Sequence, residues 1–394
     1  MSISVQERYF SLNRIILLAT GLWPYQQSKF ARFQAALYLS MMISFIIFLL
    51  SRLCFTEQSF EFTLHLLSMS TYFIFLLIKY ISFWINMKSI RYLLEQFQYI
   101  YKRLKDSKEI AIYNKYGNNG KRITIGLIIV GICTQTYLIA IQCLPHILDM
   151  IMPKNETYMH RFIVIVTEGF AVQEKYFYLL FLYLYAVLTA GAVTLIAVGA
   201  MLLSCLKHIC GMFRIASYRF EQAVTATLQN ITLKNKTMFY KEFIYAVDIH
   251  RKATEYAKCV LGDMERSLFV VTMVTVLCLS LNLYEVFQIK SPMQEIEKTM
   301  GHLLLIIFLF IYMFAANYAG QEITDSNNHV FLAVYNAPWY LAPLQMQKLT
   351  LFLLQRNSKA FTLSIGGLFT LSIECFTSLV SASVSYFTLM LSLY

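Results

Sequence analysis

Residues Phe177–Leu206 read FYLLFLYLYAVLTAGAVTLIAVGAMLLSCL, a stretch without a single Asp, Glu, Lys, Arg or His. A bilayer hydrocarbon core of about 30 Å is crossed by roughly 20 helical residues, so this stretch predicts a membrane-spanning helix. Six other apolar stretches meet the same rule, and the predicted spans are 35–55, 64–85, 123–146, 177–206, 268–288, 300–319 and 363–393. We therefore predict an all-α integral membrane protein whose 394 residues form one seven-helix membrane domain.

The composition agrees with a membrane protein. The chain is 58% hydrophobic and 14% charged, with a mean hydropathy of +0.56. That is more apolar surface than one or two soluble cores can bury. Near the start, Arg8 and Arg14 interrupt the apolar sequence and leave only the run Ile15–Ala19, which is too short for a signal peptide, so we expect the N-terminus to be retained.

The basic residues predict the orientation in the membrane. The N-terminal segment and the second, fourth and sixth loops carry most of the Lys and Arg, whereas the opposite face carries only six. Those six are Arg52, Lys154, Arg161, Lys175, Lys290 and Lys298. Positive loops stay cytoplasmic, which predicts a cytoplasmic N-terminus and an extracellular C-terminus. The net charge of +11 is then explained without a nucleic-acid partner.

Glycosylation signals give a mixed answer. Asn155 begins an Asn-Glu-Thr acceptor in a loop predicted to be extracellular, so Asn155 is a candidate site. Asn230 and Asn235 begin similar triplets that this orientation places in the cytoplasm. Taken alone, the triplets favour the reverse orientation. We follow the charge asymmetry, because three-residue patterns arise often by chance.

No motif predicts an enzyme. The chain has no nucleotide-binding loop, Cys-x-x-Cys pair or Gly-x-Ser-x-Gly, so we expect no catalytic residue, cofactor or metal. The eight cysteines are expected to be mostly free, with a Cys54–Cys143 disulfide as the alternative. Four ionisable groups lie at membrane depth: Lys79, Glu285, His302 and Glu374. We expect Lys79 to reach the inner interface, Glu285 and His302 to lie near the outer one, and Glu374 to pair or face water.

Two connecting segments have the pattern of amphipathic helices. Apolar residues recur every three or four positions in Ile90–Leu104 and in Phe239–Leu261, with charged residues on the other side. Such helices either lie on the inner membrane surface or pack together in a cytoplasmic bundle. We favour the bundle.

Aromatic residues extend several turns into the outer halves of three spans. They include Tyr72, Phe73, Tyr137, Tyr178 and Phe181. A mostly apolar cavity with a few hydroxyl donors suits a small hydrophobic ligand, and such cavities lie between bundle helices. We predict that these five residues line a ligand pocket, the alternative being ordinary helix packing.

Short motifs in the last third of the chain resemble a known family. They are Trp339-Tyr340-Leu341-Ala342-Pro343, Gln347-Lys348, Gln355-Arg356, Gly366-Gly367, Ser372-Ile373-Glu374-Cys375-Phe376 and Ser383-Val384-Ser385-Tyr386-Phe387-Thr388-Leu389. In order and spacing they are similar to the C-terminal signature of insect odorant receptors. Gly21-Leu22-Trp23-Pro24-Tyr25 resembles an N-terminal motif of members from ants, bees and wasps.

The resemblance implies a tuning subunit of a ligand-gated, non-selective cation channel that senses small apolar odorants or hydrocarbons. It implies a tetramer formed with a shared odorant co-receptor in the plasma membrane of olfactory sensory neuron dendrites, with membrane lipid around it. Residues 320–362 would belong to a cytoplasmic anchor, and Leu389 and Ser392 would form the gate and outer mouth of the pore. A gustatory-type channel of the same architecture is an alternative. A transporter is less consistent with the sequence because no helix carries a pair of coupling carboxylates, and a G-protein-coupled receptor is less consistent because its N-terminus would be extracellular.

Overall fold

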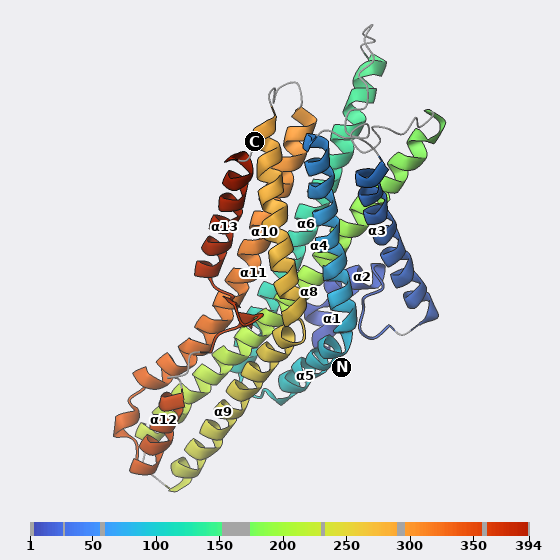
Figure 1. Cartoon of the computed structure of the whole chain (residues 1–394). Coiled ribbons are helices and arrows are strands. Elements are labelled where there is room, and N and C mark those ends of the chain that lie inside the picture. Colours follow the sequence, from blue (N-terminus) through green and yellow to red (C-terminus); the bar gives the residue numbers. More distant parts are fainter. Residues whose placement is uncertain are drawn as a thin grey trace.

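The computed structural model describes residues 4–26, 28–55, 60–151, 174–229, 233–289, 296–356 and 361–392. The described chain is almost entirely helical (Figure 1). Its helices are α1 (Val5–Tyr9), α2 (Ser11–Ala19), α3 (Lys29–Phe55), α4 (Phe60–Ile85), α5 (Met87–Arg103), α6 (Ser107–Ile151), α8 (Glu174–Gln229), α9 (Leu233–Gly262), α10 (Glu265–Gln288), α11 (Ile296–Asn336), η1 (Trp339–Leu341), α12 (Leu344–Arg356) and α13 (Ile373–Ser392). Two short strands, β1 (Ser364–Ile365) and β2 (Phe369–Thr370), precede the last helix.

Seven helices of the described chain are long and apolar enough to cross a membrane: α3, α4, α6, α8, α10, α11 and α13. Each contains one of the predicted spans or most of it, so the predicted fold class is confirmed. Helices are what the bilayer requires, because its core offers no water to satisfy backbone N–H and C=O groups.

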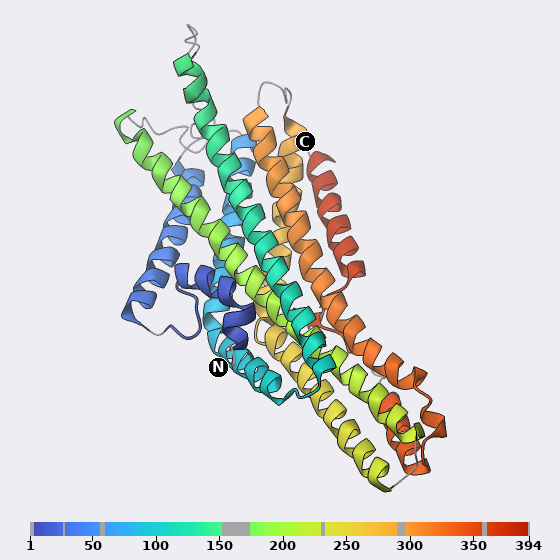
Figure 2. The same ribbon diagram turned by 180° about the vertical axis from the view of Figure 1, so that it is seen from behind.

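Three of these helices are much longer than a membrane is thick. α6, α8 and α11 contain 45, 56 and 41 residues. At about 1.5 Å per residue, α8 is roughly 84 Å long, against a hydrocarbon core of about 30 Å. Figures 1 and 2 show α8 and α11 continuing past the main bundle at one end, where α9 and α12 pack against them. We call this part the extension.

The two amphipathic segments are the helices α5 and α9, and both bury their apolar faces within the chain. On α5 the residues Ile90, Leu93, Leu94, Phe97 and Ile100 are buried. On α9 the residues Phe243, Ala246, Ile249, Ala253, Tyr256, Ala257 and Val260 are buried. They belong to one core with residues of α1, α2 and α8. The prediction of a packed bundle is thus confirmed, and neither helix keeps its apolar face for a lipid surface.

A half-buried arginine ties three helices together in the extension. Arg219 of α8 donates through Nη2 to Glu109 of α6 at 2.7 Å and through Nη1 to Glu242 of α9 at 2.7 Å. Its guanidinium also stacks over the ring of Tyr245, 3.7 Å from the centroid. Glu109 is almost completely buried, so its charge depends on this arginine.

The N-terminal motif has a structural role. Gly21 has a φ of 71°, and the N–H groups of Gly21 and Leu22 donate to the carbonyls of Leu18 and Leu17. This is the hydrogen-bond pattern of a Schellman cap, which ends α2 and uses glycine for the left-handed position. Trp23 is then buried, and the Tyr25 hydroxyl accepts a hydrogen bond from Gln6 at 2.7 Å. The motif therefore joins α2 to the core.

The last span is shorter than predicted. Its helix begins at Ile373 rather than at residue 363, because residues 364–370 form an antiparallel hairpin in which Ser364 pairs with Thr370. Gly366 and Gly367 have φ values of 60° and 67°, a left-handed conformation that ends a helix and closes a turn. The Ser372 hydroxyl then accepts from the N–H of Cys375 and caps α13.

We predict that Arg219→Met lowers the free energy of unfolding by about 3–5 kcal/mol, because it leaves the Glu109 carboxylate buried without its partner. The melting temperature of the detergent-solubilised protein measures this. The matched control is Arg251→Met, which removes an exposed i,i+3 ion pair with Asp248 and should cost less than about 1 kcal/mol. Equal losses for the two variants would contradict the assignment of Arg219.

Candidate functional site

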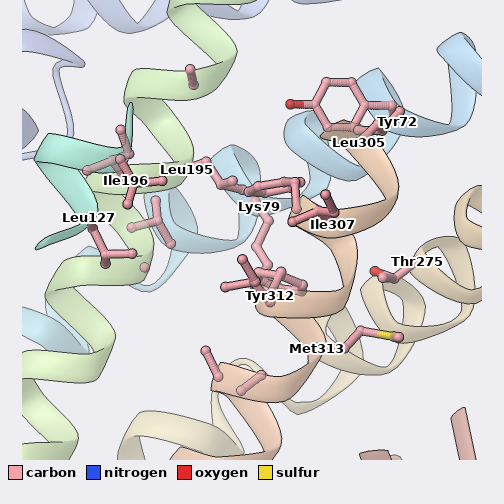
Figure 3. A pocket seen from close by; sticks show the side chains of 18 of the residues that line it. Tyr72, Lys79, Leu127, Leu195, Ile196, Thr275, Leu305, Ile307, Tyr312 and Met313 are labelled. Carbon is pink, nitrogen blue, oxygen red and sulfur yellow. The ribbon is translucent and has the colours of Figure 1, made fainter. Parts of the chain in front are cut away.

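A cavity of about 540 Å³ lies between the spanning helices. Its walls come mainly from α4, α6, α8 and α11, with α10, α13 and the hairpin closing one side. Figure 3 shows Leu127, Leu195, Ile196, Leu305 and Ile307 around it. Its size is that of small-molecule pockets in proteins, and its lining is almost wholly apolar.

One lysine stands out in this apolar wall. Lys79 of α4 is buried, with 7% of its surface exposed, and lines the cavity. Its Nζ lies 4.8 Å from the centroid of the Tyr312 ring of α11, and Figure 3 shows the two side chains together. The sequence predicted that Lys79 would reach the interface; instead, the ring's negative face stabilises the ammonium inside the bundle.

Tyr72 offers a second polar group to the cavity. Figure 3 shows its hydroxyl on the cavity side of α4. Within the described part of the chain, the structure gives this hydroxyl no hydrogen-bond partner. By contrast, the hydroxyl of Thr275 donates to the Val271 carbonyl at 2.7 Å, and that of Thr134 donates to Val130 at 2.9 Å. Tyr72 and Lys79 can therefore address the polar atom of a ligand, and His65, His302, Gln135 and Asn317 also line the cavity.

The predicted aromatic residues divide into three groups. Tyr72 and Tyr137 both line the cavity. Phe73 does not, because it is buried against Phe45 with ring centroids 4.6 Å apart, so its assignment to the pocket is corrected. Tyr178 and Phe181 belong to α8, but their side chains lie outside the described residues.

Two other predictions also fall outside the described part of the chain. Asn155 is not among the described residues. The side chains of Cys54 and Cys143, the candidate disulfide, are not described either. The cysteines that the structure does describe, including Cys205 and Cys278, are free.

Helix α13 has two contrasting faces. Leu379, Ser383 and Phe387 recur every four residues and are buried, and the Ser383 carbonyl accepts from the hydroxyl of Ser280 on α10 at 3.0 Å. The opposite face is exposed and carries hydroxyl groups at Ser378, Ser381, Ser385, Thr388 and Ser392. Those of Ser385, Thr388 and Ser392 donate to carbonyls of their own helix, as hydroxyls do in apolar surroundings.

Leu389 and Ser392 both lie on this exposed face. Leu389 is 54% exposed and lies between Thr388 and Ser392 of the hydroxyl row, and Val384 and Tyr386 of α13 are exposed as well. Glu374 is exposed in the first turn of the helix, as the water-facing prediction requires. Figure 1 shows α13 at the edge of the bundle, so this face has no cover from the rest of the described chain.

Glu285 and His302, which the sequence predicted near the outer interface, lie close to the end of α10 and the start of α11 respectively. Both are buried, and they meet His65 of α4 near the cavity, which the two histidines line. No sequence pattern predicted a role for His65, because these three residues come from three different helices. Most of the cavity wall was not predicted either, and the small residues Gly131 and Ala192 were the available signal for it.

Comparison with known proteins places the chain among insect receptors. The family model described as 7tm Odorant receptor matches residues 59–384. Odorant receptor 22c of Drosophila melanogaster is 25% identical over 243 residues, which are 57% of this chain and 56% of the relative. The odorant receptor coreceptor of Harpegnathos saltator is 23% identical over 163 residues, 41% of this chain and 33% of the relative.

Among the curated relatives, Odorant receptor 10 of Aedes albopictus is 27% identical over 96 residues, which cover 23% of this chain and 26% of the relative. The matched regions thus span between about a quarter and just over half the length of these relatives. The fold is similar to that of the olfactory receptor OR5 from Machilis hrabei in complex with eugenol, with a TM-score of 0.76, 13% identity and 99% of both chains covered.

Proposed function

Because this chain belongs to the 7tm odorant receptor family, we propose that it is the odorant-binding subunit of a ligand-gated, non-selective cation channel. The observation that carries the channel assignment is the exposed face of α13. Arranged around a central axis, such a row of hydroxyls lines a water-filled pore. Several copies of α13 meeting on this face would form that pore.

The position of Leu389 supports a gate. It interrupts the hydroxyl row close to the C-terminal end of α13, next to Ser392. A ring of leucines closes a narrow pore by excluding water, and a small outward movement readmits it. The pore thus closes at Leu389 and continues past Ser392 to the extracellular side, if the basic loops hold the extension in the cytoplasm.

The cavity between α4, α6, α8 and α11 binds the odorant. Its apolar wall selects by shape, and Tyr72 and Lys79 supply donors for one hydrogen-bond acceptor. The ligand class is therefore a small, mostly apolar molecule with an ether, carbonyl, ester or hydroxyl oxygen. Eugenol in the related OR5 structure is a molecule of this kind.

The partner is a shared odorant co-receptor. Co-receptors are among the relatives of this chain, and the described part of the extension, which includes α12 (Leu344–Arg356), offers a helical surface for the association of subunits. The assembly is placed in the dendritic plasma membrane of olfactory sensory neurons, with Asn155 on the extracellular side as a glycosylation site.

Whole-cell recording tests the proposal. Cells that express this chain together with an insect odorant co-receptor should give cation currents to a panel of oxygenated volatiles and hydrocarbons while G-protein signalling is blocked. Cells with either subunit alone are the controls, and the current should need both. Currents that the block abolishes would identify a metabotropic receptor instead.

We predict that Tyr72→Phe raises the half-maximal concentration of oxygen-containing ligands about tenfold, the effect of one lost hydrogen bond of roughly 1.4 kcal/mol. Responses to a hydrocarbon of the same shape should not change. The matched control is Tyr318→Phe, since Tyr318 stacks on Phe314 and does not line the cavity. Equal shifts for both ligand types, or for both variants, would remove Tyr72 from the site.

We predict that Leu389→Ser produces current without ligand, because a polar ring no longer excludes water from the pore. The matched control is Leu391→Ser, a position two residues along and therefore about 200° around the helix. It should leave the basal current low. A closed Leu389→Ser channel that still reaches the cell surface would contradict the gate.

A further inference from the structure

His65, Glu285 and His302 bring three metal-ligand atoms together inside the bundle. One nitrogen from each histidine and one carboxylate oxygen lie within 4.8 Å of one another, and all three residues are buried. Glu285 Oε2 is 3.7 Å from His65 Nδ1 and 3.7 Å from His302 Nε2. These distances are longer than hydrogen bonds and close to the roughly 3.3 Å between neighbouring ligands of a tetrahedral ion with bonds of about 2.0 Å.

A hydrogen bond from a neighbouring side chain fixes how His302 is turned. Asn282 donates through Nδ2 to the Cys278 carbonyl at 2.7 Å, so its Oδ1 faces His302 Nδ1, at 2.8 Å. Nδ1 must then carry the proton, and Nε2 presents its lone pair toward Glu285. Metal-binding histidines are oriented in the same way, by a carbonyl or carboxylate on the nitrogen that does not bind the ion.

His65 adds a second, independent observation. Its Nδ1 is buried and has no hydrogen-bond partner within the described chain, although it points to the same carboxylate oxygen. A buried polar atom in this position is costly unless a partner satisfies it. Both histidines also line the large cavity, which gives an ion a route to the site.

The geometry points to a binding site for one divalent transition-metal ion, with Zn²⁺ as the best fit, on His65, Glu285 and His302. Two imidazoles and one carboxylate are ligands that Zn²⁺ accepts, and they leave a further position for water. The single negative charge of Glu285 offsets part of the ion's charge inside the bundle. The ion would link α4, α10 and α11 at one end of the cavity.

The competing interpretation is a metal-free ion pair in which a protonated histidine neutralises Glu285. The two differ in a direct way. A metal site binds a stoichiometric ion and loses it when a ligand is removed, whereas an ion pair has no affinity for Zn²⁺. Neither depends on channel activity, so a failure of the proposed function would leave this test intact.

The experiment uses the full chain, purified in detergent with an affinity tag that contains no histidine. After equilibration with Zn²⁺ and gel filtration, elemental analysis should find one Zn²⁺ per chain. Titration with Co²⁺ should give visible absorption bands of a low-coordinate site, and Zn²⁺ should raise the melting temperature.

Three variants remove ligands singly: His65→Gln, Glu285→Gln and His302→Gln. Each should lose the bound Zn²⁺ and the Co²⁺ bands, while Asn282→Leu, which removes the orienting hydrogen bond but no ligand, should weaken binding by about 10–100-fold. His329→Gln is the matched control, because His329 contacts Arg214 and Ser217 about 40 Å further along α11 and should keep the ion.

Glu285→Gln has nearly the same shape as the native residue and guards against misfolding, which the melting temperature without metal would reveal. Wild-type protein that retains no Zn²⁺, or a zinc content unchanged by all three ligand substitutions, would overturn the proposal.

Discussion

The continuous length of α8 is the constraint on which the rest of the structure depends. A helix of 56 residues crosses the membrane with roughly 20 of them, so more than half of its length lies outside the hydrocarbon core. Its polar half cannot stand alone in water with apolar residues exposed, so α6, α9 and α11 pack against it, and Phe97 of α5 stacks on His208. The ion pairs between helices follow from this packing: Arg219 binds the buried Glu109 and the partly exposed Glu242, and Lys207 meets Glu322 of α11 at 2.6 Å. The membrane bundle and the extension are thus one rod-like framework rather than two separate bodies.

The parts of this fold that the sequence predicts well are those governed by one dominant force. Uninterrupted apolar length identifies the seven spans, and a three-to-four residue period of apolar side chains identifies α5 and α9. The last span shows the limit. Residues 363–371 are as apolar as a helix, but Gly366 and Gly367 adopt left-handed φ angles and form a hairpin. Composition does not distinguish these two outcomes; the consecutive glycines were the available signal.

The site is less predictable, because it depends on the rotation of each helix. Neighbouring residues lie about 100° apart around a helix, so Tyr72 lines the cavity while Phe73 packs into the core. Both residues are aromatic, and for that reason both were predicted to line the ligand pocket. Lys79 was predicted to reach the inner interface because it lies near the end of its helix. Its actual contact, the ring of Tyr312, comes from another helix and could not be foreseen. The cluster of His65, Glu285 and His302 joins positions more than two hundred residues apart, which no spacing rule detects.

The cavity and the proposed pore helix share a wall, and this makes a short coupling path. Cys375 and Leu379 of α13 line the cavity, and Leu379 is also buried in the cluster that seats α13 against Leu279 and Leu309. A ligand in the cavity therefore touches the inner face of the helix whose outer face carries Leu389. It shifts the gate only by its difference in affinity between the two states. If one state gains about 100 Å² of apolar contact, the difference is about 2.5 kcal/mol, nearly two orders of magnitude in the open-to-closed ratio. Close fit against Leu379 thus suffices for strong gating without any long relay of interactions.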